Sequence, residues 1–171
     1  MAEALTSLQV VFKLIGALTQ TTDLSSPADV LNYDKTFVYG HGTGAGQANM
    51  WWHDQRTLAG SATEDLDLAG SLVSVFGTTI TFTSLKGIVV YAAAANNAAN
   101  NVNVTRPATL GTTLFLAVSD GIALGPGEIF AWFTPAANGR TVTAGSADLI
   151  TITNSAGTNT VTYDVFLLGE V

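Results

Sequence analysis

The chain has 171 residues, a formal net charge of -7 and no cysteine; only 11% of its residues are charged, whereas 47% are hydrophobic. A typical soluble domain has about 25% charged residues, so this chain has few charges with which to cover a surface. The acidic balance excludes a basic stripe for nucleic-acid phosphates, and the lack of cysteine excludes disulfides and thiolate chemistry. We expect neither direct nucleic-acid binding nor a membrane span, since no apolar run approaches the length of about 20 residues that a span requires.

The first predicted element is a strand over residues 8–18, where apolar side chains occur at both even and odd positions. Successive side chains of a strand point to opposite faces, so this pattern predicts a strand covered on both sides. Residues 19–34 are polar and contain a Ser-Ser-Pro sequence, which predicts a loop with room for one helical turn. We therefore divide the chain into an N-terminal strand and arm, residues 1–34, and a β-sandwich body, residues 35–171.

The glycine-rich segment at residues 40–46 predicts a loop, because glycine tolerates backbone angles that other residues avoid. Residues 48–58 follow as a predicted strand in which Trp51 and Trp52 must point to opposite faces. Residues 79–83 alternate threonine with large apolar residues, as a half-buried strand does. Residues 86–93 are more uniformly apolar and predict a buried strand.

The second half of the chain has short apolar segments separated by turn residues. The strands predicted there cover residues 112–118, 122–124, 128–134, 148–153 and 160–168. Asn138-Gly139 is a strong hairpin signal, so we expect the strand before it to pair with residues 140–144. The whole pattern predicts a single all-β domain, an antiparallel β-sandwich of jelly-roll-like form, with a hairpin-rich meander in its C-terminal half.

Candidate metal and phosphate sites are weak. His41 and His53 are the only histidines, and a metal ion held by both would also need Asp34 or Asp54. The glycine-rich loop has no lysine after it and no predicted helix, so it lacks what a phosphate cradle requires. We expect no metal and no cofactor.

The densest acidic cluster contains Glu64, Asp65 and Asp67. Paired carboxylates can hydrolyse glycosides only within a cleft that tunes their pKa values. Because Asp65 and Asp67 alternate with leucines, we interpret them as a solvated face or as interface partners of Arg56 or Arg106, with a weak divalent-cation site as an intermediate hypothesis. No catalytic residue is evident, and we expect no enzyme.

The three tryptophans, Trp51, Trp52 and Trp132, are the remaining candidates for an interaction site. Aromatic side chains on strands usually belong to a core or a subunit contact, because each buries a large area. The outward member of the Trp51-Trp52 pair is the best single candidate for an oligomer contact, and a carbohydrate-stacking platform is the alternative.

Six segments of the chain form a recognisable pattern: residues 64–72, 76–82, 86–88, 125–128, 142–149 and 162–169. They resemble segments of the small virion proteins that tailed bacteriophages encode in their structural modules. The resemblance extends from residue 40 to the end and concerns structural rather than catalytic motifs.

The resemblance implies a non-enzymatic protein that decorates or cements a capsid, with the major capsid protein as its partner. It also implies a location on the capsid surface of the virion, and in the host cytoplasm during assembly. A homo-oligomer is expected, with a homotrimer favoured because a three-fold capsid site requires one. The alternative is a receptor- or carbohydrate-binding module of a phage head fibre or tail.

Overall fold

The computed structural model describes residues 5–171, and over that range the chain forms twelve β-strands and no helix. It follows that no helix of the described part is long and apolar enough to cross a membrane. The strands are β1 Ser7–Thr19, β2 Ala28–His41, β3 Gln47–Ala48, β4 Met50–Leu58, β5 Thr63–Asp67, β6 Ser84–Ala92, β7 Val102–Thr105, β8 Gly121–Leu124, β9 Ile129–Phe133, β10 Arg140–Thr141, β11 Leu149–Asn154 and β12 Val161–Glu170.

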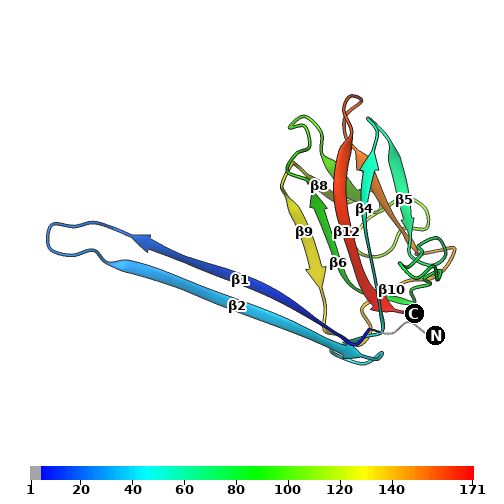
Figure 1. Ribbon diagram of the computed structural model, residues 1–171, viewed down its shortest axis with the longest axis horizontal. Helices are drawn as coiled ribbons and strands as arrows, with labels where there is room; N and C mark the ends of the chain where they lie inside the picture. The colour runs from blue at the N-terminus through cyan, green and yellow to red at the C-terminus, as the bar shows by residue number, and fades with distance from the viewer. Residues whose placement is uncertain (1–4) are drawn as a thin grey trace.

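The first two strands form a long hairpin, which we call the arm (Figure 1). β1 and β2 pair antiparallel along their whole length, from Ser7 opposite Gly40 to Thr19 opposite Ala28. The arm leaves one end of the molecule and extends well beyond the rest of the chain. Among residues 5–171, only the short strand β3 adds to it, parallel to the end of β2.

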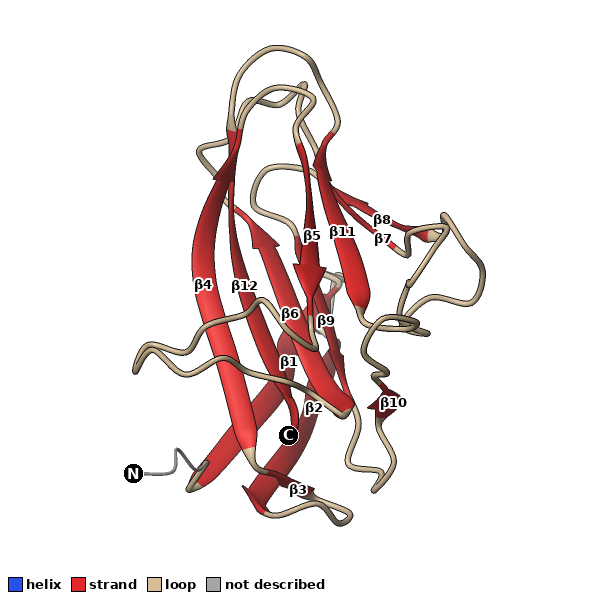
Figure 2. Cartoon of the chain, turned by 90° about the vertical axis from the view of Figure 1, so that its right-hand side faces the viewer, coloured by secondary structure: helices blue, strands red, loops and turns tan. Residues whose placement is uncertain are grey.

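The remaining strands form the body, a sandwich of two sheets (Figure 2). Sheet I has the order β10-β6-β12-β4, with β9 also paired to β6, and sheet II has the order β5-β11-β7-β8. The pairs between these strands are antiparallel. The prediction of an all-β antiparallel sandwich is therefore confirmed.

The core lies between sheets I and II and is built from alternate residues of each strand. On β12, for example, Val161, Tyr163, Val165 and Leu167 are buried. β-Branched and aromatic side chains suit such a surface because they pack well against the pleat. The period of two that predicted the strands therefore also places the core residues.

The pairing of the body strands is nested. β4 pairs with β12, β5 with β11, β6 with β9, and β7 with β8. If the short β10 is left out, the first body strand therefore pairs with the last, the second with the second last, and so on to the central pair β7 and β8. The C-terminal half is consequently not a meander, and that prediction is wrong, because its strands insert between earlier ones.

Two predictions for the N-terminal segment need correction. The strand predicted at residues 8–18 is confirmed by β1, but its two faces are largely exposed rather than covered. The loop predicted over residues 19–34 ends before Ala28, where β2 begins, and no helical turn forms. The polar residues of β2 misled the interpretation because they lie on a ribbon that is solvated along most of its length.

The segment at residues 112–118 is not a strand, contrary to prediction. Its backbone is held in turns by side chains, since the Arg106 guanidinium donates to the carbonyl oxygens of Phe115 and Leu116, and the Thr112 hydroxyl accepts from the Leu114 amide. These local bonds replace the ladder that a strand would need.

The turn at Asn138-Gly139 does not join a hairpin. β9 and β10 both pair with β6, one beyond the other along the same edge, rather than with each other. Residues 79–83 alternate in burial as predicted, but they are not part of a regular strand. Their backbone bonds instead to a loop, since the Ile80 and Phe82 amides donate to the carbonyl oxygens of Leu72 and Leu68.

Candidate functional site

The arm has one strongly apolar face. Side chains that are paired across the strands, and those two apart along a strand, point to the same side. The register therefore collects nine large apolar residues on one side, which we call the apolar arm face: Leu8, Val10, Phe12, Leu14, Leu18, Leu31, Tyr33, Phe37 and Tyr39. The opposite face alternates apolar with polar residues, including Lys13 directly opposite Asp34.

The root of the apolar arm face is packed against the body. Tyr39 is fully buried in a small cluster that also contains Leu5, Ala48 and Leu168, with Phe133 and Phe166 of sheet I packed against it. The Phe12 ring lies 6.2 Å from Phe37 and 6.3 Å from Phe133, edge to face in both cases. Such aromatic pairs add to the stabilisation that burial of the rings provides.

Exposure rises steadily from the root of this face to its tip. Phe12 is 38% exposed, Leu14 59% and Leu18 78%. On the other strand Tyr33 and Leu31 are also exposed. The distal half of the apolar arm face is therefore uncovered within the single chain, although its chemistry is the same as that of the packed root.

A buried lysine connects the base of the arm to the body. The side chain of Lys86 is 0% exposed, and its Nζ lies 2.8 Å from Oε1 of Glu170. The same Nζ donates to the carbonyl oxygens of Gly44, in the loop that follows β2, and of Ala136, which follows β9. One ammonium group therefore joins three segments that are distant in sequence, and this holds the root in place.

The glycines of the loop after β2 are needed for its close packing. At Gly42, whose φ is 141°, an added Cβ would lie 2.4 Å from Oε1 of Gln47. The Gln47 oxygen occupies this position because it accepts from the Gly44 amide at 2.8 Å. The predicted loop is thus confirmed from Gly42 onwards, and it serves as the turn that fixes the arm.

Sheet I presents a second apolar area on the side that faces away from the core. Trp51 is 44% exposed there, and its ring contacts His53 at 6.3 Å and Phe166 at 6.0 Å, both edge to face. Ile129 is 61% exposed at the β9 edge of the same sheet. We call this area the outer sheet I face; its members are Trp51, His53, Val89, Ile129 and Phe166.

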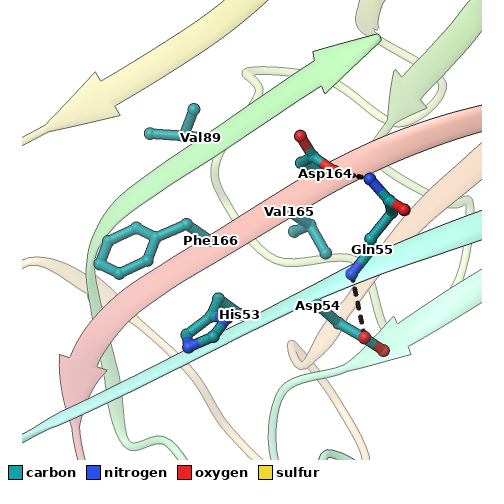
Figure 3. Close-up of a pocket in the computed structure, with 7 residues that line it drawn as sticks. All are labelled: His53, Asp54, Gln55, Val89, Asp164, Val165 and Phe166. Atoms are coloured by element: carbon teal, nitrogen blue, oxygen red, sulfur yellow. Dashed lines mark hydrogen bonds between the residues drawn. The ribbon is translucent and has the colours of Figure 1, made fainter. Parts of the chain in front are cut away.

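An open hollow lies within this face, between β4, β12 and β6 (Figure 3). His53, Val89 and Phe166 line it on one side, and Gln55 and Asp164 on the other. Gln55 Nε2 donates to Oδ1 of Asp164 at 2.8 Å, so the polar side of the hollow is pre-ordered. The hollow thus combines an aromatic wall with fixed hydrogen-bonding groups.

The prediction that Trp51 and Trp52 point to opposite faces is confirmed. Trp52 is 4% exposed in the core, where its Nε1 donates to the carbonyl oxygen of Val73 and Arg56 lies over the ring. Trp132 packs against the core and has Arg140 over it at 5.4 Å. Only Trp51 of the three presents a broadly exposed ring, and its role at an interface stays a prediction.

The acidic cluster is divided between two faces of β5. Glu64 points toward sheet I, where Oε2 lies 2.5 Å from the Arg56 guanidinium and Oε1 accepts from the Tyr163 hydroxyl at 2.6 Å. Burial, followed by this hydrogen bond, raises the pKa of the Tyr163 phenol above its ordinary value. Burial alone would lower the pKa of Arg56, but Glu64 outweighs it and raises that pKa.

Asp65 and Asp67 lie on the other face of β5, as their alternation with leucines predicted. Asp65 accepts from the Thr151 hydroxyl on the paired strand, and Asp67 accepts from the Ala69 amide. Neither carboxylate pairs with Arg56, which binds Asp54 and Glu64, or with Arg106, which binds backbone carbonyl groups. Within the chain both aspartates serve local structure.

The two histidines lie in different parts of the fold, and His53 shares the open hollow with Asp54 and Asp164. His41 ends β2 with its Nδ1 3.1 Å from the Leu5 carbonyl oxygen, whereas His53 lies on the outer sheet I face. Over residues 5–171, no group of three or more metal-ligating side chains is close enough to hold an ion.

Sequence reasoning missed the role of Lys86 and the distal part of the second arm strand, residues 28–34, which it assigned to a loop. The signal for the strand was present, since Leu31, Tyr33, Phe37 and Tyr39 recur with a period of two. No local pattern distinguishes Lys86 from a lysine at the exposed start of a strand. Its partners become neighbours only in the folded chain.

Comparisons with known proteins give no relatives: no family model, no curated protein and no solved structure matches this chain. The arm and the outer sheet I face are therefore interpreted from their own chemistry.

Proposed function

We propose that this chain is a non-enzymatic structural protein of a bacteriophage virion, which decorates or cements the capsid through protein–protein contacts. The observation that carries the proposal is the uncovered distal half of the apolar arm face. Soluble monomers rarely expose contiguous apolar patches of this kind, and larger ones mark sites of association. An extended arm is suited to reaching across the junction between neighbouring subunits.

We also propose that the body is a jelly roll, and the nested order of its strands, with the short β10 set aside, supports this. An eight-stranded, two-sheet jelly roll is an architecture that viral capsid and lectin domains use. A fold does not define a function, so this point adds to the argument from the arm and does not replace it.

The proposed partners are other copies of this chain, in a trimer, and the major capsid protein. The proposed location is the capsid surface of the virion, with the host cytoplasm as the place of assembly. The low content of charge supports contacts of this type, because the centres of interfaces are depleted of charged residues. The net charge of -7 argues against binding to packaged nucleic acid.

The test is co-expression of the full chain with the major capsid protein of the same phage, followed by separation of assembled shells on a density gradient. We expect the chain to sediment with the shells in a fixed ratio. A chain that remains at the top of the gradient while shells sediment would refute the capsid role.

A second candidate function is favoured by the hollow, where the His53 and Phe166 rings lie opposite the ordered Gln55 and Asp164 pair. The exposed Trp51 ring extends this aromatic wall, because it contacts both rings. Carbohydrate sites combine a flat aromatic surface with a few fixed polar groups. A receptor- or carbohydrate-binding module would use this hollow, with Gln55 and Asp164 bonding to sugar hydroxyls. Glycan-array binding by the full chain that is lost in Trp51→Ala, but kept in Ile129→Ala, would favour this function over capsid decoration.

A further inference from the structure

We infer that the distal half of the apolar arm face of one copy docks on the outer sheet I face of a second copy. The docking residues on the arm are Leu14, Leu18, Leu31 and Tyr33, and the receiving surface contains Trp51, Val89 and Ile129. The inference deepens the proposed function and rests on its self-association, although not on its binding to a capsid.

The first step is that the arm needs a cover. A two-stranded hairpin is marginally stable by itself, because it lacks a second layer against which to bury its side chains. Here the distal half of the arm is such a hairpin, with Leu14, Leu18 and Leu31 each at least half exposed. A second layer supplied by another molecule would remove this deficit.

The second step is that the chain itself shows what kind of surface covers this face. The root of the apolar arm face packs on residues from sheet I, namely Phe133, Phe166 and Leu168. Leu14 and Tyr33 directly continue the same face of the ribbon beyond the root. The surface that fits the distal half is therefore of the same kind as the one that covers the root, namely the outer face of an apolar sheet.

The third step is that each copy carries such a surface uncovered. Trp51 and Ile129 are exposed on the outer sheet I face, and Phe166 links this area to the packed root. In the folded chain the arm extends away from the body, and Lys86 bonds to the loop at its base (Figure 1). In this arrangement the free part of the arm reaches such a surface on another molecule and not on its own.

The fourth step concerns charge and symmetry. On the apolar arm face the charged residues are Lys35, whose ammonium lies over the Tyr33 ring, and Asp29 near the tip. On the arm side docking therefore buries few charges, and on the receiving side the Asp164 carboxylate already accepts a hydrogen bond from Gln55, which limits its desolvation cost. Because the donating and receiving surfaces differ, the contact is heterologous. Repetition of such a contact forms a ring, such as the proposed trimer, when the rotation between neighbouring copies completes a circle.

Cross-linking tests the contact directly, because the natural chain has no cysteine. Two single-cysteine variants of the full chain, Leu14→Cys and Ile129→Cys, are mixed and treated with a flexible bis-maleimide. Any product that joins the two variants must link different copies. We expect this mixed product, and expect little of it when Ile129→Cys is replaced by Asp65→Cys on the outside of sheet II.

Light scattering, which measures association between copies, tests which face of the arm makes the contact. Leu14→Asp and Ile15→Asp place the same charge on adjacent exposed residues that point to opposite faces of the arm. Because burying a leucine corresponds to an affinity change of about tenfold or more, we expect Leu14→Asp to weaken association by about that factor. Ile15→Asp should have a much smaller effect.

Three results would overturn the inference: a stable monomer at micromolar concentration, equal effects of Leu14→Asp and Ile15→Asp, or cross-links that join only arm to arm or arm to sheet II. Failure of the proposed capsid role can be distinguished from failure of the arm contact. An arm-linked oligomer that does not bind shells would refute the capsid role alone, whereas shell binding by a monomer would refute the arm contact alone.

Discussion

The arm and the body are built from the same kind of strand but differ in what lies against it. In the body, sheets I and II face each other and bury alternate residues of each strand, such as Leu66 and Val165. In the arm, β1 and β2 carry equally apolar residues with no opposing sheet beyond the root. Alternation of apolar residues thus specifies a strand, whereas the presence of a second layer decides whether that strand becomes a core or a surface.

This difference predicts that substitutions in the body and at the root affect folding, whereas those in the distal arm affect association. Four comparisons test it, in order of decreasing expected effect on the free energy of unfolding.

The largest effect is expected at the buried link between arm and body. Lys86→Ala leaves the Glu170 carboxylate without its cation and two carbonyl groups without their donor. Breaking a buried ion pair in this way costs about 3–5 kcal/mol. Urea unfolding followed by circular dichroism measures the loss, with Lys13→Ala on the exposed arm as the control. A loss no larger than that of the control would mean that Lys86 does not hold the root.

The next effect contrasts a leucine of the core with one of the arm. Leu66 is 0% exposed, and Leu66→Ala is expected to lower the free energy of unfolding by about 2–5 kcal/mol through the cavity it leaves. Leu18→Ala removes the same atoms from a side chain that is 78% exposed, and should change stability by less than about 0.5 kcal/mol in dilute solution. Equal losses would show that the distal arm is covered in the folded monomer.

The third prediction concerns the Tyr163 hydroxyl and its bond to Glu64. Tyr163→Phe removes a hydrogen bond to a charged group and should cost about 1.5–3 kcal/mol at neutral pH. Tyr33→Phe, on the exposed arm, is the control and should cost little.

The same residue makes stability depend on pH in alkaline solution. The pKa of Tyr163 is raised in the folded chain, first by burial and then by Glu64, so the unfolded chain loses this proton at a lower pH. The stabilisation is therefore complete below about pH 10 and is lost as the pH rises above it, at about 1.4 kcal/mol per pH unit and proton. Tyr163→Phe should reduce this slope, while Tyr39, whose pKa burial also raises, retains part of it. An unchanged slope would contradict the assignment.

The smallest effects are expected from two glycines. At Gly169, beside the irregular pairing of β12 with β6, an added Cβ would lie 2.3 Å from the Ser84 carbonyl oxygen. Gly169→Ala should therefore cost about 1–3 kcal/mol through overpacking. At Gly16 in the arm nothing lies within 4 Å, so Gly16→Ala should be neutral or stabilise by up to about 1 kcal/mol. Thermal unfolding of both variants measures the contrast; a destabilised Gly16→Ala would indicate a neighbour that packs on the arm.

Much of the secondary structure followed from local pattern. A continuous apolar run marked β1, and a period of two marked β5, β11 and β12 and placed Trp51 and Trp52 on opposite faces. The strand predicted at residues 112–118 does not form, because side chains supply hydrogen bonds there in place of a neighbouring strand. Arg106 does so for Phe115 and Leu116, and no pattern within residues 112–118 records an arginine that precedes them.

Single residues of the candidate site could be predicted from the sequence, but the surfaces that they form together could not. The outward member of the Trp51-Trp52 pair was identified as the best candidate ring, but the apolar arm face was not identified, because the distal part of its second strand was interpreted as a loop. Joining Leu14 to Tyr33 requires the hairpin register, and joining Lys86 to Glu170 requires the fold of the whole chain.

The sequence by itself determined that this protein is all-β, poor in charge and rich in apolar strands, because composition and a period of two are local properties of the chain. The tertiary structure alone decided which of those strands face each other and which extend into solvent. The reason is that burial is a relation between segments distant in sequence. An apolar residue becomes core or contact surface according to what the rest of the fold brings against it.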